Sequence, residues 1–258
     1  MMILPPPFVV GGCQIPVTMD INFNLREIKK AIDWASNNGV DILSTPECAL
    51  SGYLWHPNNS QDPRLEQINQ GIQDLVAYSV DKGVDLILGT ACYNDSNQWS
   101  DSLQFVISGK IEHIHYKNII FEHQYTKGSG VKTVNYRGKN IAGLICSDIW
   151  SNPITYPDAT AGLVRSLIEQ KCDILFVCAN TPKDQILLFK KWHSVCVEMY
   201  SDLGRWDTVV SENSYKMDGF EWDGETGVDA GVYSKMGPIK KSRDHGTDYF
   251  KMTIYERR

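Results

Sequence analysis

One short pattern recurs three times along the chain and constrains the fold more than any other feature. Each copy has apolar residues at helical spacing, then a break, then an apolar run with an aspartate at its second position, and the runs begin at Val40, Val84 and Cys172. Gly39 and Gly83, just before two of the runs, suit the left-handed position that ends a helix. The apolar run suits a strand buried by helices. The pattern predicts three helix-to-strand units.

The first of these units shows the helical signal most clearly. Leu25, Ile28, Ile32 and Ala35 are spaced by three or four residues, which leaves charged residues for the solvent side. Asn22 or Asn24 is expected to cap this helix. Hydrophobic runs and turn residues predict further strands at 8–15, 103–107, 111–116, 133–136, 141–146, 207–211, 231–233 and 249–255, and a further helix at 185–203. Helices alternating with many strands indicate a layered α/β sandwich.

Composition narrows the class of protein. The chain has 258 residues, is 42% hydrophobic and 22% charged, and has no linker-like stretch, so we expect a single domain over residues 1–258. Its 31 acidic and 25 basic residues give a net charge of −6, which offers no overall attraction to nucleic acid or anionic lipid. No apolar run reaches the roughly 20 residues that a membrane helix needs. The expected partner is a small molecule, without nucleic acid or membrane.

The cysteines indicate a reducing compartment. There are seven, an odd number, scattered singly and without a CxxC pair, which predicts free thiols and no zinc site. The N-terminus carries Pro5, Pro6 and Pro7 where a signal peptide would need an apolar helix, so we expect a cytoplasmic protein. A lone cysteine is usually a core residue. That interpretation stands for every cysteine except Cys146.

Two predicted strands end on reactive side chains. The run 42–47 ends at Glu47, and the run 141–146 ends at Cys146. In layered α/β folds such ends converge on one crevice. A nucleophilic thiol needs a base and a group that stabilises the oxyanion formed on a carbonyl. Glu47 can supply the base and Lys117 the charge, although each taken alone is more often a loop cap or a solvated lysine.

Three blocks of sequence carry a resemblance. Pro46-Glu47 followed by Leu50-Ser51-Gly52-Tyr53, then Tyr116-Lys117, then Gly143-Leu144-Ile145-Cys146-Ser147-Asp148 resemble, in order, the signature blocks of the carbon–nitrogen hydrolase (nitrilase) superfamily. The resemblance extends over about residues 8 to 255. It implies a single-domain, four-layer α-β-β-α sandwich. It also implies pairing with a second copy, as a homodimer or higher homo-oligomer.

The resemblance assigns roles to individual residues. Cys146 would be the nucleophile, Glu47 the general base and Lys117 the cation that stabilises the tetrahedral intermediate. Glu122, which precedes Tyr125 and Gly128, is the candidate for the second glutamate of the family. The backbone N–H of Ser147 would also donate to the oxyanion.

The implied reaction cleaves an amide or carbamoyl C–N bond through a cysteine thioester, releases ammonia or an amine, and needs no metal or organic cofactor. One carboxylate can handle both proton transfers only in a dry pocket, because burial brings the pKa of a carboxyl group nearer to neutrality. We therefore expect Glu47 to be buried.

The substrate pocket is less defined by the sequence. The segment 150–158 is longer than its family counterpart, so the wall beside the nucleophile is expected to be remodelled. Side chains expected to line the pocket are Tyr53, Ser147, Trp150, Asn152, Asn180 and Trp192.

Alternative functions stay open. The chain could be a true nitrilase, an N-acyl transferase, or a catalytically silent binding or scaffold protein. The intact trio of Glu47, Lys117 and Cys146 argues against the silent form. His113 and His115 lie on one face of a strand and could bind a metal, but without a visible third ligand we expect a structural role.

Overall fold

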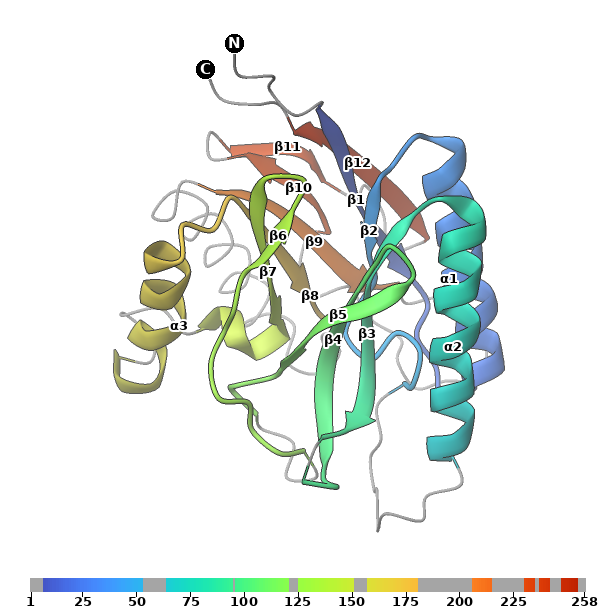
Figure 1. Cartoon of the computed structure of the whole chain (residues 1–258), viewed down its shortest axis with the longest axis horizontal. Coiled ribbons are helices and arrows are strands. Elements are labelled where there is room, and N and C mark those ends of the chain that lie inside the picture. Colours follow the sequence, from blue (N-terminus) through green and yellow to red (C-terminus); the bar gives the residue numbers. More distant parts are fainter. Residues whose placement is uncertain are drawn as a thin grey trace.

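The computed structural model describes residues 7–52, 64–94, 96–120, 125–150, 157–180, 206–214, 230–234, 237–241 and 247–254. Helices α1 (Ile21–Asn37) and α2 (Arg64–Lys82) cover one sheet, and α3 (Pro157–Glu169) covers a second sheet on the other side (Figure 1). The expected four-layer α-β-β-α arrangement is confirmed. Within the described ranges no helix has the length and hydropathy that a membrane span requires.

The strands form two sheets that join at one point. The first sheet has the order β5-β4-β3-β2-β1, and β12 is antiparallel to β1. The second has the order β9-β8-β7-β6, with β10 on β9 and β11 on β10. The strands are β1 (Phe8–Ile15), β2 (Ile42–Ser44), β3 (Asp85–Tyr93), β4 (Trp99–Ile107), β5 (Lys110–Tyr116), β6 (Val134–Tyr136), β7 (Lys139–Ile145), β8 (Ile174–Cys178), β9 (Asp207–Asn213), β10 (Gly231–Ser234), β11 (Gly237–Lys241) and β12 (Asp248–Ile254). The sheets meet where β1 and β9 pair in parallel through Gln14 with Glu212 and Ile15 with Asn213.

The predicted elements are present wherever the structure describes the chain. Gly39 and Gly83 end α1 and α2 with φ of 65° and 67°, as the left-handed position requires. The short strand β11 was not expected, and the helix expected at 185–203 lies outside the described residues.

The predicted cap of α1 is wrong. Asp20 is the cap, because its carboxylate accepts from the N–H groups of Asn22 and Phe23 at 2.9 and 3.1 Å. Asn24 lies inside the helix, fully buried, and its amide donates to the carbonyls of Thr18 and Leu50. An N-cap residue precedes the helix, whereas Asn24 uses its side chain to fix the two loops that lie against α1.

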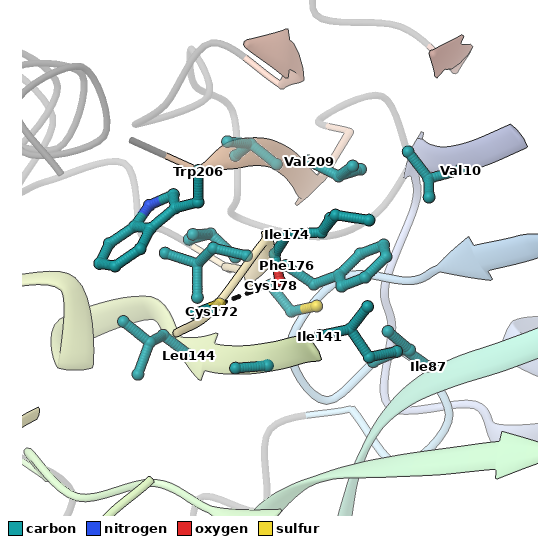
Figure 2. Packing of buried hydrophobic residues seen from close by; sticks show 14 of the residues in the cluster. Val10, Ile87, Ile141, Leu144, Cys172, Ile174, Phe176, Cys178, Trp206 and Val209 are labelled. Carbon is teal, nitrogen blue, oxygen red and sulfur yellow. Dashed lines mark hydrogen bonds between the residues drawn. The ribbon is translucent and has the colours of Figure 1, made fainter. Parts of the chain in front are cut away.

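The core between the two sheets is apolar and tightly packed. Ile87, Leu103 and Phe105 of the first sheet belong to one buried cluster with Ile141, Phe176 and many others of the second. Figure 2 shows part of this cluster. A second cluster packs α1 and α2 against the outer face of the first sheet. The sheets are close enough that a Cβ on Gly143 would lie 2.7 Å from Cδ1 of Leu103, so glycine is needed there.

We call the junction of β1 and β9 the seam. Two buried serines link the two sheets near it. The Oγ atoms of Ser44 and Ser211 are 2.7 Å apart, and Ser211 Oγ also donates to the carbonyl of Ser44 at 3.0 Å. The same Oγ accepts from the N–H of Cys13 at 3.2 Å. Since Ser44 ends β2, the strand that leads to Glu47 is fixed to the second sheet.

Candidate active site

Glu47 lies in a tight turn that follows β2. The turn is held against β3, since the N–H of Thr45 donates to the carbonyl of Ile87 and the N–H of Leu50 donates to the carbonyl of Gly89. A Cβ on Gly89 would lie 2.0 Å from the carbonyl oxygen of Pro46, so the close approach depends on glycine. The Glu47 side chain has no exposed surface, which confirms the expected burial.

Lys117 follows β5 and lies between two carboxylates. Its Nζ is 2.7 Å from Oε1 of Glu47 and 3.7 Å from Oδ2 of Asp101, and all three side chains are at most 1% exposed. The backbone also contributes, because the N–H of Lys117 donates to the carbonyl of Asp101 at 2.9 Å. Removing three charged groups from water together is tolerated only because they are paired. Lys117 therefore has a fixed position beside Glu47.

The sequence did not identify Asp101. It lies in β4, and only the antiparallel pairing of β4 with β5, in which Ser102 is opposite Tyr116, brings it beside Lys117. Its only local signal is a charged residue within a strand whose neighbours are all buried. That signal alone does not say which group the carboxylate contacts.

Cys48 is a second thiol beside this charged cluster. Its Sγ donates to Oδ1 of Asp101 at 3.5 Å and lies 4.0 Å from the hydroxyl of Tyr125. Burial raises the pKa of Cys48 well above its ordinary value, and the nearby carboxylates of Asp101 and Glu47 raise it further. Cys48 is therefore a neutral core thiol, as expected from the sequence, although it directly follows Glu47.

Cys146 begins the 3-10 helix η1 (Cys146–Trp150), directly after β7. Its φ is 39°, which is the left-handed region that non-glycine residues rarely adopt and that is frequent at functional sites. The residue is 8% exposed. The preceding N–H, that of Ile145, donates to Oδ2 of Asp148 at 3.2 Å, so the turn is closed on itself.

Asp148 ties this turn to the chain that follows Lys117. Its Oδ1 accepts from the N–H groups of Asn118 and Ile119 at 2.7 and 2.8 Å, and its Oδ2 lies 3.1 Å from Nε2 of His115. The side chain has no exposed surface. The hydroxyl of Ser147 adds a bond to the carbonyl of Ile119. The sequence assigned no role to Asp148, because three of its four partners lie about 30 residues earlier.

His115 contacts Asp148 and so supports the turn at Cys146. Within the described part of the chain, no group of three His, Cys, Asp or Glu side chains could hold a metal ion.

Asn180 gives a second link, from the end of β8. Its side chain is buried, donates to the carbonyl of Glu47 at 3.5 Å and accepts from Nδ2 of Asn213. In the sheet, β8 lies beside β7, with Cys178 opposite Ile145. Burial raises the pKa of Cys178, and the Cys13 thiol and the carboxylate of Glu47 raise it further. The ends of β2, β7 and β8 thus lie together, as strand ends do in layered α/β folds.

The remaining predicted site residues have different outcomes. Ser147 is buried directly after Cys146, and Trp150 ends η1, although the structure does not describe its side chain. Four predicted residues lie outside the described residues, and their roles stay predictions: Glu122, Tyr53, Asn152 and Trp192.

This geometry agrees with a comparison of families. The carbon-nitrogen hydrolase family model matches residues 9–199, which is most of the chain. The chain belongs to the carbon-nitrogen hydrolase family. The resemblance of the three sequence blocks is therefore confirmed at the level of the family. The sequence has no match among the curated proteins.

Solved structures show the same fold at low sequence identity. A mutant of the amidase from Nesterenkonia sp. AN1, which carries the acetamide moiety of fluoroacetamide on its active-site cysteine, has a TM-score of 0.78 at 15% identity, over 96% of this chain and 90% of the amidase. Another structure of an amidase from Nesterenkonia sp. has a TM-score of 0.76 at 16% identity, over 98% and 92%. The glutamine-dependent NAD+ synthetase from Acinetobacter baumannii has a TM-score of 0.77 at 17% identity over 97% of this chain. The present chain spans only 46% of that synthetase.

Proposed function

We propose that this carbon-nitrogen hydrolase cleaves the amide or carbamoyl C–N bond of a small molecule through a thioester on Cys146. Glu47 acts as the general base and Lys117 stabilises the oxyanion. Direct contact of the buried Glu47 and Lys117 side chains, at 2.7 Å, is the observation that carries this proposal. A thiol nucleophile requires a base to accept its proton, and the oxyanion formed by its attack requires a stabilising charge.

The first half of the reaction makes the thioester. Glu47 accepts the proton of the Cys146 thiol, and the sulfur attacks the carbonyl carbon. Negative charge develops on the carbonyl oxygen, where the Lys117 ammonium and the backbone N–H of Ser147 stabilise it. Glu47 then gives its proton to the nitrogen, the C–N bond breaks, and ammonia or an amine leaves.

The second half returns the enzyme to its starting state. Glu47 accepts a proton from a water molecule, whose oxygen attacks the thioester carbon. The carbon–sulfur bond breaks, the acid leaves, and the sulfur recovers its proton from Glu47. An amide substrate yields a carboxylic acid, whereas a carbamoyl substrate yields a carbamic acid that loses carbon dioxide. Glu122, the candidate second carboxylate, would assist these proton transfers.

Several features support the choice of Cys146 and of the amide class. Cys146 has the left-handed φ of 39° and a turn anchored by Asp148, while the pKa of the competing thiol of Cys48 is raised. The Nesterenkonia amidase, which shares the fold, is described as reacting at its active-site cysteine. We also propose that the protein is located in the cytoplasm and forms a homodimer or a higher homo-oligomer. Reduced thiols at all six described cysteines suit the cytoplasm.

The test is ammonia or amine release from a panel of short-chain amides, ω-amides, ureido acids and nitriles. Wild type is compared with Cys146→Ala, and Cys48→Ala serves as the matched thiol control. We expect release from an amide or ureido acid that disappears in Cys146→Ala and persists in Cys48→Ala.

Two other results would redirect the proposal. Release from nitriles alone would make the chain a true nitrilase. No release from any compound, together with a Cys146 that iodoacetamide does not modify by intact mass, would favour the catalytically silent binding protein.

A further inference from the structure

A cavity lies beside the candidate active site. Its volume is about 720 Å³, and it is lined by β5 and the two residues Asn118 and Ile119, the segment 127–132 and one face of α3. The described residues that precede β6 run between β5 and α3 (Figure 1). Gln170, directly after α3, fixes the segment, because its side chain accepts from the N–H of Thr133 and donates to the carbonyl of Val131. Glu47, Lys117 and Cys146 do not line this cavity.

The described residues of the cavity wall include two lysines and no acidic side chain. Lys127 and Lys132 both line it, and neither makes an ion pair with a residue that the structure describes. Among the described lining residues there is no Asp or Glu. Asp148, a buried carboxylate that contacts three of the lining residues, is occupied by four donors, including His115. The unbalanced lysines favour an anionic ligand.

His113 also lines the cavity. Its ring packs against Phe105, with 5.5 Å between the ring centres. Burial lowers the pKa of His113 to about 4, and the adjacent His115 and Lys132 contribute to the lowering. A histidine that resists protonation is consistent with positively charged surroundings.

Part of the wall is apolar, and the space is large. Ile119, Val131 and Leu163 line it. The volume lies within the range of about 300 to 1,000 Å³ that is typical of small-molecule sites. An inorganic anion alone would leave most of it empty, so the shape fits an anionic group attached to an apolar body.

We propose that this cavity binds a small organic anion, whose carboxylate or phosphate group pairs with Lys127 and Lys132 and whose apolar part contacts Ile119, Val131 and Leu163. The site is separate from the proposed hydrolase site and does not depend on it. It is nevertheless adjacent, because Asn118 lines the cavity directly after Lys117, and the N–H of Gly128 donates to the carbonyl of Lys117 at 2.8 Å.

The test is calorimetric titration of the full chain with three probes that share a phenyl ring: phenyl phosphate, benzoate and neutral phenol. We expect at least one anion to bind about tenfold more tightly than phenol, the factor that a single charge-assisted hydrogen bond provides. The tighter of the two anions identifies the anionic group. The measurement needs no turnover, so it is informative whether or not the chain hydrolyses amides.

Variants locate the binding. The double variant Lys127→Ala/Lys132→Ala should weaken the anion about tenfold or more and leave phenol unchanged. Both lysines are exposed, so the variant should fold, and circular dichroism checks this. Lys110→Ala is the matched control, since Lys110 is an exposed lysine of β5 that does not line the cavity. Equal affinity for phenol and both anions, or an unchanged affinity in the double variant, would overturn the proposal.

Discussion

At the scale of single residues, Lys117 is a buried charge that lies between two carboxylates. It is 1% exposed and contacts Glu47, with Asp101 at 3.7 Å. Breaking a buried ion pair by removing one partner costs far more than the pair contributes, because the other charge is left unpaired. Here the carboxylates of Glu47 and Asp101 would both lose the lysine as a partner.

The first prediction concerns this lysine. Lys117→Met should lower the free energy of unfolding by about 3–5 kcal/mol and abolish C–N hydrolysis. Urea denaturation followed by tryptophan fluorescence gives the stability. Lys110→Met, at a lysine whose side chain is 69% exposed, should stay within about 0.5 kcal/mol of wild type. A Lys117→Met protein as stable as wild type would contradict the buried pairing.

The second prediction concerns Asp148 as a positioning residue. In Asp148→Asn an amide NH₂ would face donors, since both carboxylate oxygens accept from backbone N–H groups. We expect a loss of about 1–3 kcal/mol in stability and a slower reaction of Cys146 with iodoacetamide at pH 7. Asp81→Asn is the control, because the Asp81 side chain is 75% exposed. Unaltered labelling of Cys146 in a destabilised Asp148→Asn would restrict Asp148 to a structural role.

The third prediction concerns pH. His113 has a pKa of about 4 in the folded protein, lowered from 6.5 by burial with His115 and Lys132 nearby. Between these two values the unfolded chain binds the proton and the folded one does not, so stability falls as the pH drops from about 6.5 to about 4. Comparing urea denaturation at pH 7 and pH 5, we expect a smaller difference in His113→Gln than in wild type. The same difference in both proteins would refute this assignment.

At the scale of elements, two glycines should respond oppositely to alanine. A Cβ on Gly143 of β7 would lie 2.7 Å from Leu103 and 3.1 Å from Phe105, whereas a Cβ on Gly162 of α3 has no atom within 4 Å. Gly143→Ala should destabilise by about 1–3 kcal/mol, the cost of overpacking a core. Gly162→Ala should stabilise by about 0.5–1 kcal/mol, because alanine is the better helix former. Thermal denaturation measures both, and equal shifts in one direction would exclude this packing.

Sequence patterns predicted the elements better than their contacts. The helices α1, α2 and α3 could be predicted because apolar residues recur at helical spacing. The strands β7 and β8 could be predicted because their sequences are short, mostly apolar runs. The strand β11 contains Pro238 and two lysines, so its sequence is not typical of a strand. The cap of α1 was misassigned because Asn24 also has a suitable side chain, and only its distance from the true helix start excludes it.

The candidate site was predicted in part for the same reason. Glu47, Lys117 and Cys146 stand at strand ends within recognisable blocks. The contacts of Asp101 and three of the four bonds to Asp148 depend on which strands pair and in which register, and local sequence does not contain that information. The cavity beside β5 is built from three separate segments, so no single stretch of sequence indicates it.

At the scale of the whole molecule, the candidate site is shared between the two sheets. Glu47, Asp101 and Lys117 follow or belong to strands of the first sheet, while Cys146 and Asn180 follow strands of the second. The seam between β1 and β9 pairs only two residues of each strand. The relative position of the sheets therefore also depends on the inter-sheet core and on the serine pair.

The last prediction concerns this seam. Ser211→Ala removes the acceptor of the buried Cys13 N–H and the partner of Ser44, so we expect a loss of about 1–3 kcal/mol in stability. The turnover number should fall as well, since Glu47 lies three residues after Ser44. Ser79→Ala, in which a buried serine of α2 loses only a bond to a carbonyl of its own helix, is the control. Wild-type stability and turnover in Ser211→Ala would show that the serines do not hold the sheets together.

The division of the site between the sheets also sets an order in time. Synthesis from the N-terminus produces Glu47 and Lys117 first, and Cys146 about 30 residues after Lys117. The strand β9, which forms the seam, emerges about 60 residues after the thiol. A growing chain thus carries every reactive group before it can align them. We therefore expect no hydrolysis before β9 has been synthesised, and in a refolding experiment the onset of catalysis would report the closing of the seam.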